Sequence, residues 1–172
     1  FGIQNLQLFT AVPHPSPPVP PSPPGTWSPG AVAEDTWPGA TGWSGTALDV
    51  TTCGLLGTML GGYQVLGPGS AGHVEKTFTN LPMHGSLRVR AFYTRVDRLA
   101  TGLIYVDGAE VWRKSFYYLE SGSQHACGDG GHGLNNDIQA EVDITISHSS
   151  ESATIRVTAD GNEGWFGIQH LQ

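Results

Sequence analysis

The chain has 172 residues, a net charge of −7, and charged side chains at only 13% of its positions. This length predicts one domain with room for a core. The negative charge argues against a nucleic-acid partner, which would need a basic face. No apolar run approaches the ~20 residues that a membrane-spanning helix requires, so no membrane partner is expected. The 24 glycines favour a β protein with many turns over a helical bundle.

The two ends of the chain carry nearly the same heptapeptide. Residues 1–7 read FGIQNLQ and residues 166–172 read FGIQHLQ, at an offset of 165 positions. That offset is about the size of a domain plus a linker, which indicates one period of a tandem array. We therefore interpret residues 1–10 as the terminal strand of a preceding repeat. The alternative is a chance similarity of two short strands.

The repeated heptapeptide of residues 1–7 and 166–172, called the echo from here on, predicts contacts between repeats. Its apolar members are expected to fill equivalent positions in successive sandwiches: Phe1, Ile3, Leu6, Phe166, Ile168 and Leu171. Two arrangements remain open, a covalent polyprotein and separate subunits joined by strand donation. The difference between Asn5 and His170 favours the covalent arrangement, because identical subunits would not need an echo.

Residues 11–30 form a linker of extreme composition. Nine of the twelve prolines of the chain fall between Pro13 and Pro29. Each proline fixes φ near −65° and disfavours helix in the residue before it. The segment is therefore predicted to be a semi-rigid polyproline II rod. A bare spacer or a polyproline ligand for a partner domain is the other interpretation.

Residues 31–172 are predicted to form one β-sandwich domain. Strands are expected over residues 87–91, 138–146 and 153–157, where apolar and polar side chains alternate. Further strands are expected over residues 74–79, 103–106 and 109–112, and from residue 165 onward. Asp107-Gly108 between two of these strands is typical of a type I′ hairpin turn. The predicted fold is an all-β, antiparallel jelly-roll-type β-sandwich preceded by a polyproline II linker.

The two cysteines, Cys53 and Cys127, are predicted to form a disulfide. They lie 74 positions apart, with no Cys-x-x-Cys spacing that would indicate a zinc ribbon. Closing such a loop is worth roughly 4–5 kcal/mol in the chain-entropy model. Two buried free thiols, which would suit a cytosolic protein better, are the alternative.

Several short segments together resemble a known kind of module: 53–54 (CG), 60–63 (LGGY), 76–78 (KTF), 81–84 (LPMH), 88–93 (RVRAFY), 105–108 (YVDG), 111–112 (VW), 146–150 (ISHSS) and 165–168 (WFGI). They resemble a jelly-roll module of large surface proteins of protists and algae. The linker separately resembles the Ser-Pro-Pro tracts of green-algal hydroxyproline-rich glycoproteins, which include cell-wall and mastigoneme (flagellar hair) proteins. In that family an acidic Asp-Ser-Trp-Asp type segment often follows the Phe-Tyr strand. Here residues 97–101 read DRLAT, so no metal or ligand role carries over.

The resemblance implies an extracellular structural glycoprotein, secreted or at the cell surface, in a wall or a flagellar hair. Its sandwiches would be strung on glycosylated rods to build a filament, with adjacent copies and O-linked glycans as partners. No Asn-x-Ser/Thr sequon is present, so glycans are expected on hydroxyproline and serine of the linker: Pro13, Pro15, Ser16, Pro17, Pro18, Pro20, Pro21, Ser22, Pro23 and Pro24. The alternative function is a carbohydrate-binding, lectin-like module of a cell-surface protein.

Few residues have the types and spacing of a catalytic, cofactor-binding or metal-binding site, and we expect no enzyme, no cofactor and no metal. There is no Gly-x-Ser-x-Gly elbow and no nucleotide-binding loop. Two groups have metal-binding residue types, but a solvated loop and ordinary turn acids are the favoured interpretations: His125, Cys127, Asp129 and His132, and the pair Asp160 and Glu163. Five tryptophans are available for stacking on sugars, although packing in the core or at a sheet edge is the favoured interpretation: Trp27, Trp37, Trp43, Trp112 and Trp165.

Overall fold

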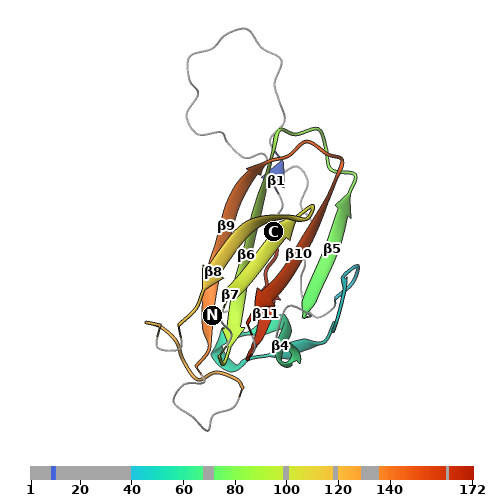
Figure 1. Cartoon of the computed structure of the whole chain (residues 1–172). Coiled ribbons are helices and arrows are strands. Elements are labelled where there is room, and N and C mark those ends of the chain that lie inside the picture. The colour runs from blue at the N-terminus through green and yellow to red at the C-terminus, as the bar shows by residue number, and fades with distance from the viewer. Residues whose placement is uncertain are drawn as a thin grey trace.

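Two antiparallel sheets packed face to face make up the sandwich seen in the computed structural model (Figure 1). The structure describes residues 40–67, 72–98, 101–117, 120–128, 136–161 and 163–172, together with the backbone of residues 9–10. The linker expected at residues 11–30 and the echoed residues 1–7 lie outside this part. Their predicted placement therefore stays a prediction.

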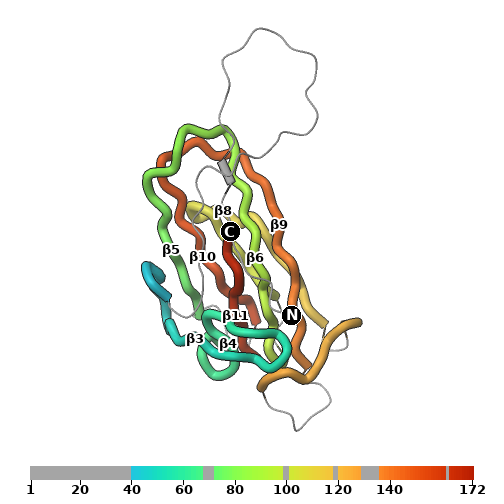
Figure 2. The backbone as a smooth tube through the Cα atoms, turned by 180° about the vertical axis from the view of Figure 1, so that it is seen from behind, coloured from blue at the N-terminus to red at the C-terminus, as the bar shows by residue number. Residues whose placement is uncertain are grey.

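The first sheet has the strand order β9–β6–β11–β4–β3, which is seen from behind in Figure 2. Its strands are β9 (Ile138–Ser147), β6 (Ser86–Val96), β11 (Trp165–Gln169), β4 (Thr58–Leu66) and β3 (Val50–Thr52). A two-residue strand, β1 (Phe9–Thr10), also pairs with β6. The second sheet has the order β2–β5–β10–β7–β8, with β2 (Ser44–Gly45), β5 (His73–Thr79), β10 (Ser152–Asp160), β7 (Thr101–Val106) and β8 (Ala109–Ser115).

The topology is that of a jelly roll. Four strands of each sheet follow its order, β4–β11–β6–β9 in one and β5–β10–β7–β8 in the other. The chain crosses from one sheet to the other at each step from β4 to β7, and again from β8 to β11. The all-β, antiparallel prediction is thus confirmed. In the described residues the helical segment is the 3-10 turn Gly54–Leu56, and no helix there is long and apolar enough to cross a membrane.

The core lies between the two inward faces and follows from the alternation in the sequence. On β6 the inward residues Leu87 and Val89 are fully buried, while the arginines between them point outward. Ile155 and Val157 do the same on β10. Each fully buried aliphatic side chain contributes about 1.5–3 kcal/mol relative to exposure. The period-two pattern therefore fixes which face of each strand meets the other sheet.

Tyr93 on β6 joins the two sheets across the core. Its ring stacks against Phe166 of β11 at 5.5 Å and against Phe116 at 5.8 Å between ring centroids. Its hydroxyl donates a hydrogen bond of 3.0 Å to the carbonyl of Thr158 on β10. Complete burial raises the pKa of this phenol well above its ordinary value, so the hydroxyl stays a donor.

The predicted hairpin is confirmed, whereas one long strand was not predicted. Asp107 and Gly108 both have positive φ, at 50° and 80°, as a type I′ turn requires. The unpredicted strand is β4, in which Gly61, Gly62 and Gln64 also have positive φ, between 61° and 98°. Such residues bend a strand out of the period-two pattern, so its sequence does not alternate.

A pair of stacked histidines closes one end of the sandwich. His84 Nδ1 lies 2.6 Å from the Pro82 carbonyl, and its Nε2 lies 2.6 Å from His148 Nδ1. His148 Nε2 in turn lies 3.0 Å from the Asp107 carboxylate. These contacts connect residues 82–84, His148 and the Asp107 turn at this end of the sandwich.

Candidate functional site

The position of the last strand, β11, in the first sheet connects the echo to the fold. β11 lies in the middle of the first sheet, between β4 and β6. The three echoed apolar residues of this copy are buried, with exposed fractions of 0%, 0% and 1%: Phe166, Ile168 and Leu171. Their counterparts Phe1, Ile3 and Leu6 lie outside the described residues. The apolar residues of the second copy of the heptapeptide, residues 166–172, are thus core residues of the sandwich.

Gln169 explains why the echo keeps a glutamine in a buried strand. The side chain is 1% exposed and all its polar capacity is used. Its Oε1 accepts from Thr94 Oγ1 at 2.8 Å and from Gln139 Nε2 at 2.5 Å. Its Nε2 donates to the carbonyls of Leu56 and Thr58 at 2.6 and 3.0 Å. An amide that offers both donors and acceptors is required here, since a buried polar group left unpaired costs about 1–3 kcal/mol.

Gly167 is required by the close approach of β4. A Cβ atom built at this position would lie 2.4 Å from the sulfur of Met59 and 2.7 Å from its Cγ. Met59 is itself fully buried, so it has little room to move away. In the first copy of the heptapeptide the corresponding residue is also a glycine, Gly2.

The single position at which the echo differs has a special backbone conformation. His170 has a φ of 50°, in the left-handed region where asparagine and histidine are several-fold enriched. It sits in a bulge. Between Gln169 opposite Phe92 and Gln172 bonded to Arg90, the strand advances three residues while β6 advances two. Asn5, the counterpart of His170, is a residue type that suits this conformation.

The predicted disulfide between Cys53 and Cys127 is present, with the two Cα atoms 4.9 Å apart. Beside it lies Asp137, which is fully buried. Its carboxylate accepts from the backbone N–H groups of Asp97, Ala126 and Cys127 at 3.0, 2.9 and 2.7 Å. Ligand atoms of Cys53, Cys127 and Asp137 lie within 4.8 Å of one another, but the sulfurs are bonded to each other. This group therefore holds the loop in place and is not a metal site.

A buried cation completes this end of the sandwich. Arg95 on β6 is fully buried and donates to the carbonyls of Tyr117 and Asn136 at 2.6 and 2.7 Å. Burial lowers the pKa of its guanidinium, and the nearby carboxylates of Glu120, Asp137 and Asp97 partly oppose that effect. The arginine thereby ties two loop segments, at Tyr117 and Asn136, to the sheet.

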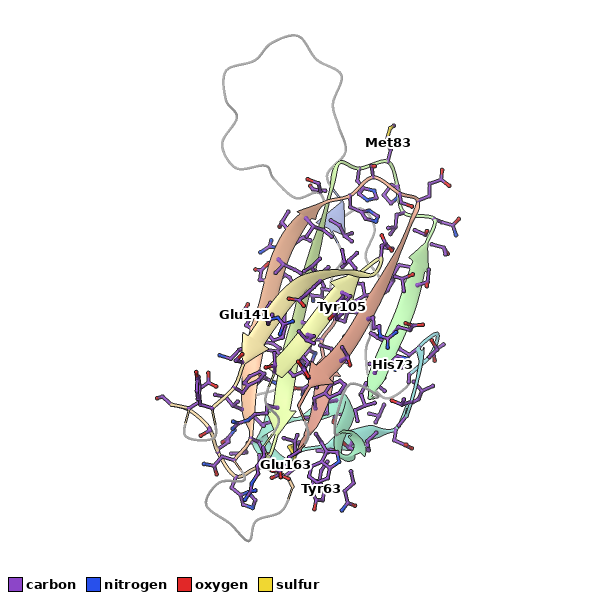
Figure 3. The ribbon with its side chains drawn as sticks, viewed as in Figure 1. Tyr63, His73, Met83, Tyr105, Glu141 and Glu163 are labelled. Carbon is purple, nitrogen blue, oxygen red and sulfur yellow. A yellow bond between two sulfur atoms is a disulfide. The ribbon has the colours of Figure 1, made fainter. Side chains whose placement is uncertain are left out.

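A second candidate site is a groove on the outer face of the second sheet. It has a volume of about 600 Å³, and β5, β7, β8 and β10 contribute its lining. Tyr105 is one of its lining residues, on the sheet that faces the viewer in Figure 3. Charged side chains flank the ring. Arg156 lies 3.7 Å from Glu75, and Arg113 donates two hydrogen bonds to Glu110. Aromatic surface with paired hydrogen-bonding groups is chemistry that suits a polar, ring-shaped ligand.

Among the described residues, the other metal-type candidates of the sequence form no common cluster. Asp129 and His132 lie outside the described residues, and Cys127 is in the disulfide. Glu163 lies 3.3 Å from Arg98, whereas Asp160 lines the groove. The described tryptophans pack as the favoured interpretation predicts: Trp43 in the core, Trp112 against Tyr93, and Trp165 edge-on to Tyr63. Trp27 and Trp37, like the proline and serine sites of the linker, lie outside the described residues.

Comparison with known proteins gives a distant match. No protein-family model matches the chain, and no curated protein matches it. Among solved structures it is similar to a family 35 carbohydrate-binding module from Clostridium thermocellum, at a TM-score of 0.43 and 13% identity, over 77% of this chain and 93% of that one. A similarity of this extent carries no argument about function.

Removing the disulfide should destabilise the fold without changing it. Replacing Cys53 and Cys127 together by serine releases a loop of 74 residues, for which about 4 kcal/mol of unfolding free energy is expected to be lost. Urea denaturation followed by tryptophan fluorescence measures this loss. An unchanged midpoint, or both thiols alkylated in the untreated protein without reductant, would contradict the assignment.

The bulge residue supplies a second prediction. Burial lowers the pKa of His170, so the folded state disfavours the charged ring. The contribution of His170 to the free energy of unfolding is therefore intact above the pKa of the unfolded state, about 6.5. It declines as the pH falls through the lower pKa of the folded state. The variant His170→Asn should keep its stability at pH 7.5 and lose less of it on acidification to pH 5.5. His170→Val, also neutral but β-branched at a positive φ, should lose about 1–2 kcal/mol at both pH values. Equal stability of the two variants in thermal unfolding would contradict the assigned backbone.

Proposed function

We propose that this chain is a structural repeat of an extracellular filament, wall or cell-surface fibre, in which sandwiches alternate with proline-rich rods. The observation that carries the proposal is that the residue types of the echo match what the position of β11 in the sheet requires. Phe166, Ile168 and Leu171 fill the core, Gly167 admits Met59, and Gln169 satisfies four buried polar groups. Residues 1–7 repeat these requirements, and they differ only where a positive φ accepts both Asn and His.

The remaining parts of the chain suit that role. A disulfide persists in an oxidising compartment, which supports an extracellular location. A polyproline rod of about 3.1 Å per residue separates neighbouring sandwiches without a flexible tether. Hydroxyproline and serine glycans on residues 13–24 would stiffen the rod and protect it from proteases. Because each sandwich contacts the next through a head-to-tail connection, no closure is needed and the array is open-ended.

A two-repeat polypeptide tests this function. It consists of residues 1–172 followed directly by a second copy of residues 8–172, which preserves the 165-residue offset. We expect two folded sandwiches, with an unfolding enthalpy about twice that of the single chain and a similar midpoint, since each domain is one cooperative unit. Small-angle scattering should give an elongated particle. A single compact particle, or one folded sandwich per two copies, would overturn the proposal.

The groove on the second sheet favours a second candidate function, the binding of carbohydrate. The half-exposed ring of Tyr105 can stack against a sugar face, and the paired side chains of Arg156 with Glu75 and Arg113 with Glu110 can bond its hydroxyl groups. Such a site is compatible with a structural role, because a fibre that binds wall polysaccharide would be anchored by it.

The variant Tyr105→Ala tests this candidate. A glycan array of neutral and acidic oligosaccharides first identifies a bound sugar, whose affinity is then measured by calorimetry. Loss of the aromatic face should weaken binding about tenfold or more, equivalent to about 1.4 kcal/mol. Tyr117→Ala is the matched control, because Tyr117 is 74% exposed and does not line the groove. Absence of any bound glycan on the array, or an equal loss in both variants, would count against carbohydrate binding.

A further inference from the structure

The edge of β6 that pairs with β11 continues beyond the end of β11, and a different segment of the chain pairs with the rest of this edge. β9 pairs with β6 along one edge, from Ser86 to Arg95. β11 and the residues after it pair along the other edge, from Val96 to Arg90, where Gln172 exchanges two backbone hydrogen bonds of 2.8 Å with Arg90. Since the β9 edge is filled, β1 must pair with Arg88 and Leu87 on the β11 edge. β1 is thus in line with β11 (Figure 1).

The register of β1 agrees with the echo. Gln7 is the counterpart of Gln172, and Phe9 lies two residues after Gln7. Along β6, Arg88 lies two residues before Arg90, and Phe9 is the residue opposite Arg88. In an antiparallel pair, two residues forward on one strand match two residues backward on the other. If residues 1–7 are superposed on residues 166–172, Phe9 falls two residues after Gln172, opposite Arg88. This is the position that Phe9 has in β1.

We propose that the edge of β6 from Leu87 to Arg90 is a docking edge for residues 8–10 of a second copy of this chain. This inference rests on the proposed function, in which residues 1–10 of one repeat complete the sandwich of the repeat before it. The last strand of each sandwich then runs from Trp165 through Gln172 and on through residues 8–10 of the second copy, with a bulge at the position of His170. The same register sets Leu8 of the second copy opposite Val89, whose side chain is fully buried in the core. In the single chain its own Phe9 and Thr10 take the edge instead.

The docking edge also sets the direction of the array. The strand would end beside Leu87, at the end of the sandwich that the His84–His148 pair closes. The described chain resumes at Ala40, and β2 pairs with Val74 and Glu75 at the beginning of β5, toward the other end. In Figure 2 this segment, drawn in cyan, lies along the lower half of the sandwich. The rods therefore enter and leave toward opposite ends, and the repeats are strung end to end.

Cysteine cross-linking tests the docking edge. Residues directly opposite each other in an antiparallel pair have Cα atoms about 4.5–5.5 Å apart, within the range of a disulfide. In the first variant, Phe9→Cys is combined with Arg88→Cys, and an intramolecular bond is expected. In the second, the same chain is extended after Gln172 by Leu-Phe-Thr, the sequence of residues 8–10. The extension should take the edge and suppress the bond between positions 9 and 88.

A reciprocal pair of chains gives the matched control. Arg88→Cys is combined with the extension Leu-Cys-Thr, which places the new cysteine opposite position 88, or with Leu-Thr-Cys, which shifts it by one residue to the other face. The in-register chain should cross-link about tenfold more than the shifted chain, as read by peptide mapping that also confirms the native disulfide. Equal yields for the two extensions, or an undiminished bond between positions 9 and 88, would overturn the docking edge. The two-repeat polypeptide would still show whether the repeat function holds.

Discussion

The burial of the last strand in the middle of the first sheet is the constraint on which the structure depends. β11 pairs with both β4 and β6, and no other strand of the described residues pairs with both. Phe166 also contacts the ring of Tyr93, which bonds to the second sheet through Thr158. Without β11 the sheet would part and the core aromatic stack would lose one side. The native sandwich therefore forms only when residues near both ends of the domain have met, as is typical of slow-folding β topologies.

This constraint explains the composition of the echoed heptapeptide. A central strand needs apolar residues on the inward face, a small residue where β4 approaches, and a polar side chain whose hydrogen bonds are all met. Phe166, Gly167 and Gln169 supply these in turn. The one position free of such demands, His170, lies in a bulge whose backbone accepts several short polar residues. In the proposed array, residues 1–7 repeat the residue types that this central strand constrains and differ at the position of His170.

Much of the fold could be predicted from the sequence because its strands are amphipathic and locally encoded. β9 and β10 alternate apolar and polar residues, β6 does so over residues 87–91, and the Asp107-Gly108 turn marks its hairpin. β4 was missed because its glycines at positive φ interrupt the alternation. The groove could not be predicted, since Glu75, Tyr105 and Arg156 come from three strands that only the topology places side by side. The same holds for the His84–His148 pair, whose members are 64 positions apart.

The two ends of the sandwich are reinforced in different ways, and the difference matters for an array under tension. The end near the disulfide is held covalently, and Arg95 and Asp137 bond the backbone of its loops. The opposite end is held by β1, by the stacked histidines and by the ion pair of Arg88 with Asp143, all non-covalent. In the proposed array, a pull along the last strand loads its hydrogen bonds to β4 and β6 in shear along both edges. Those bonds must break together, whereas a strand pulled from a sheet edge could unzip one bond at a time. In the proposed array, a central last strand would thus carry force between rods while the covalent cross-link protects the far end.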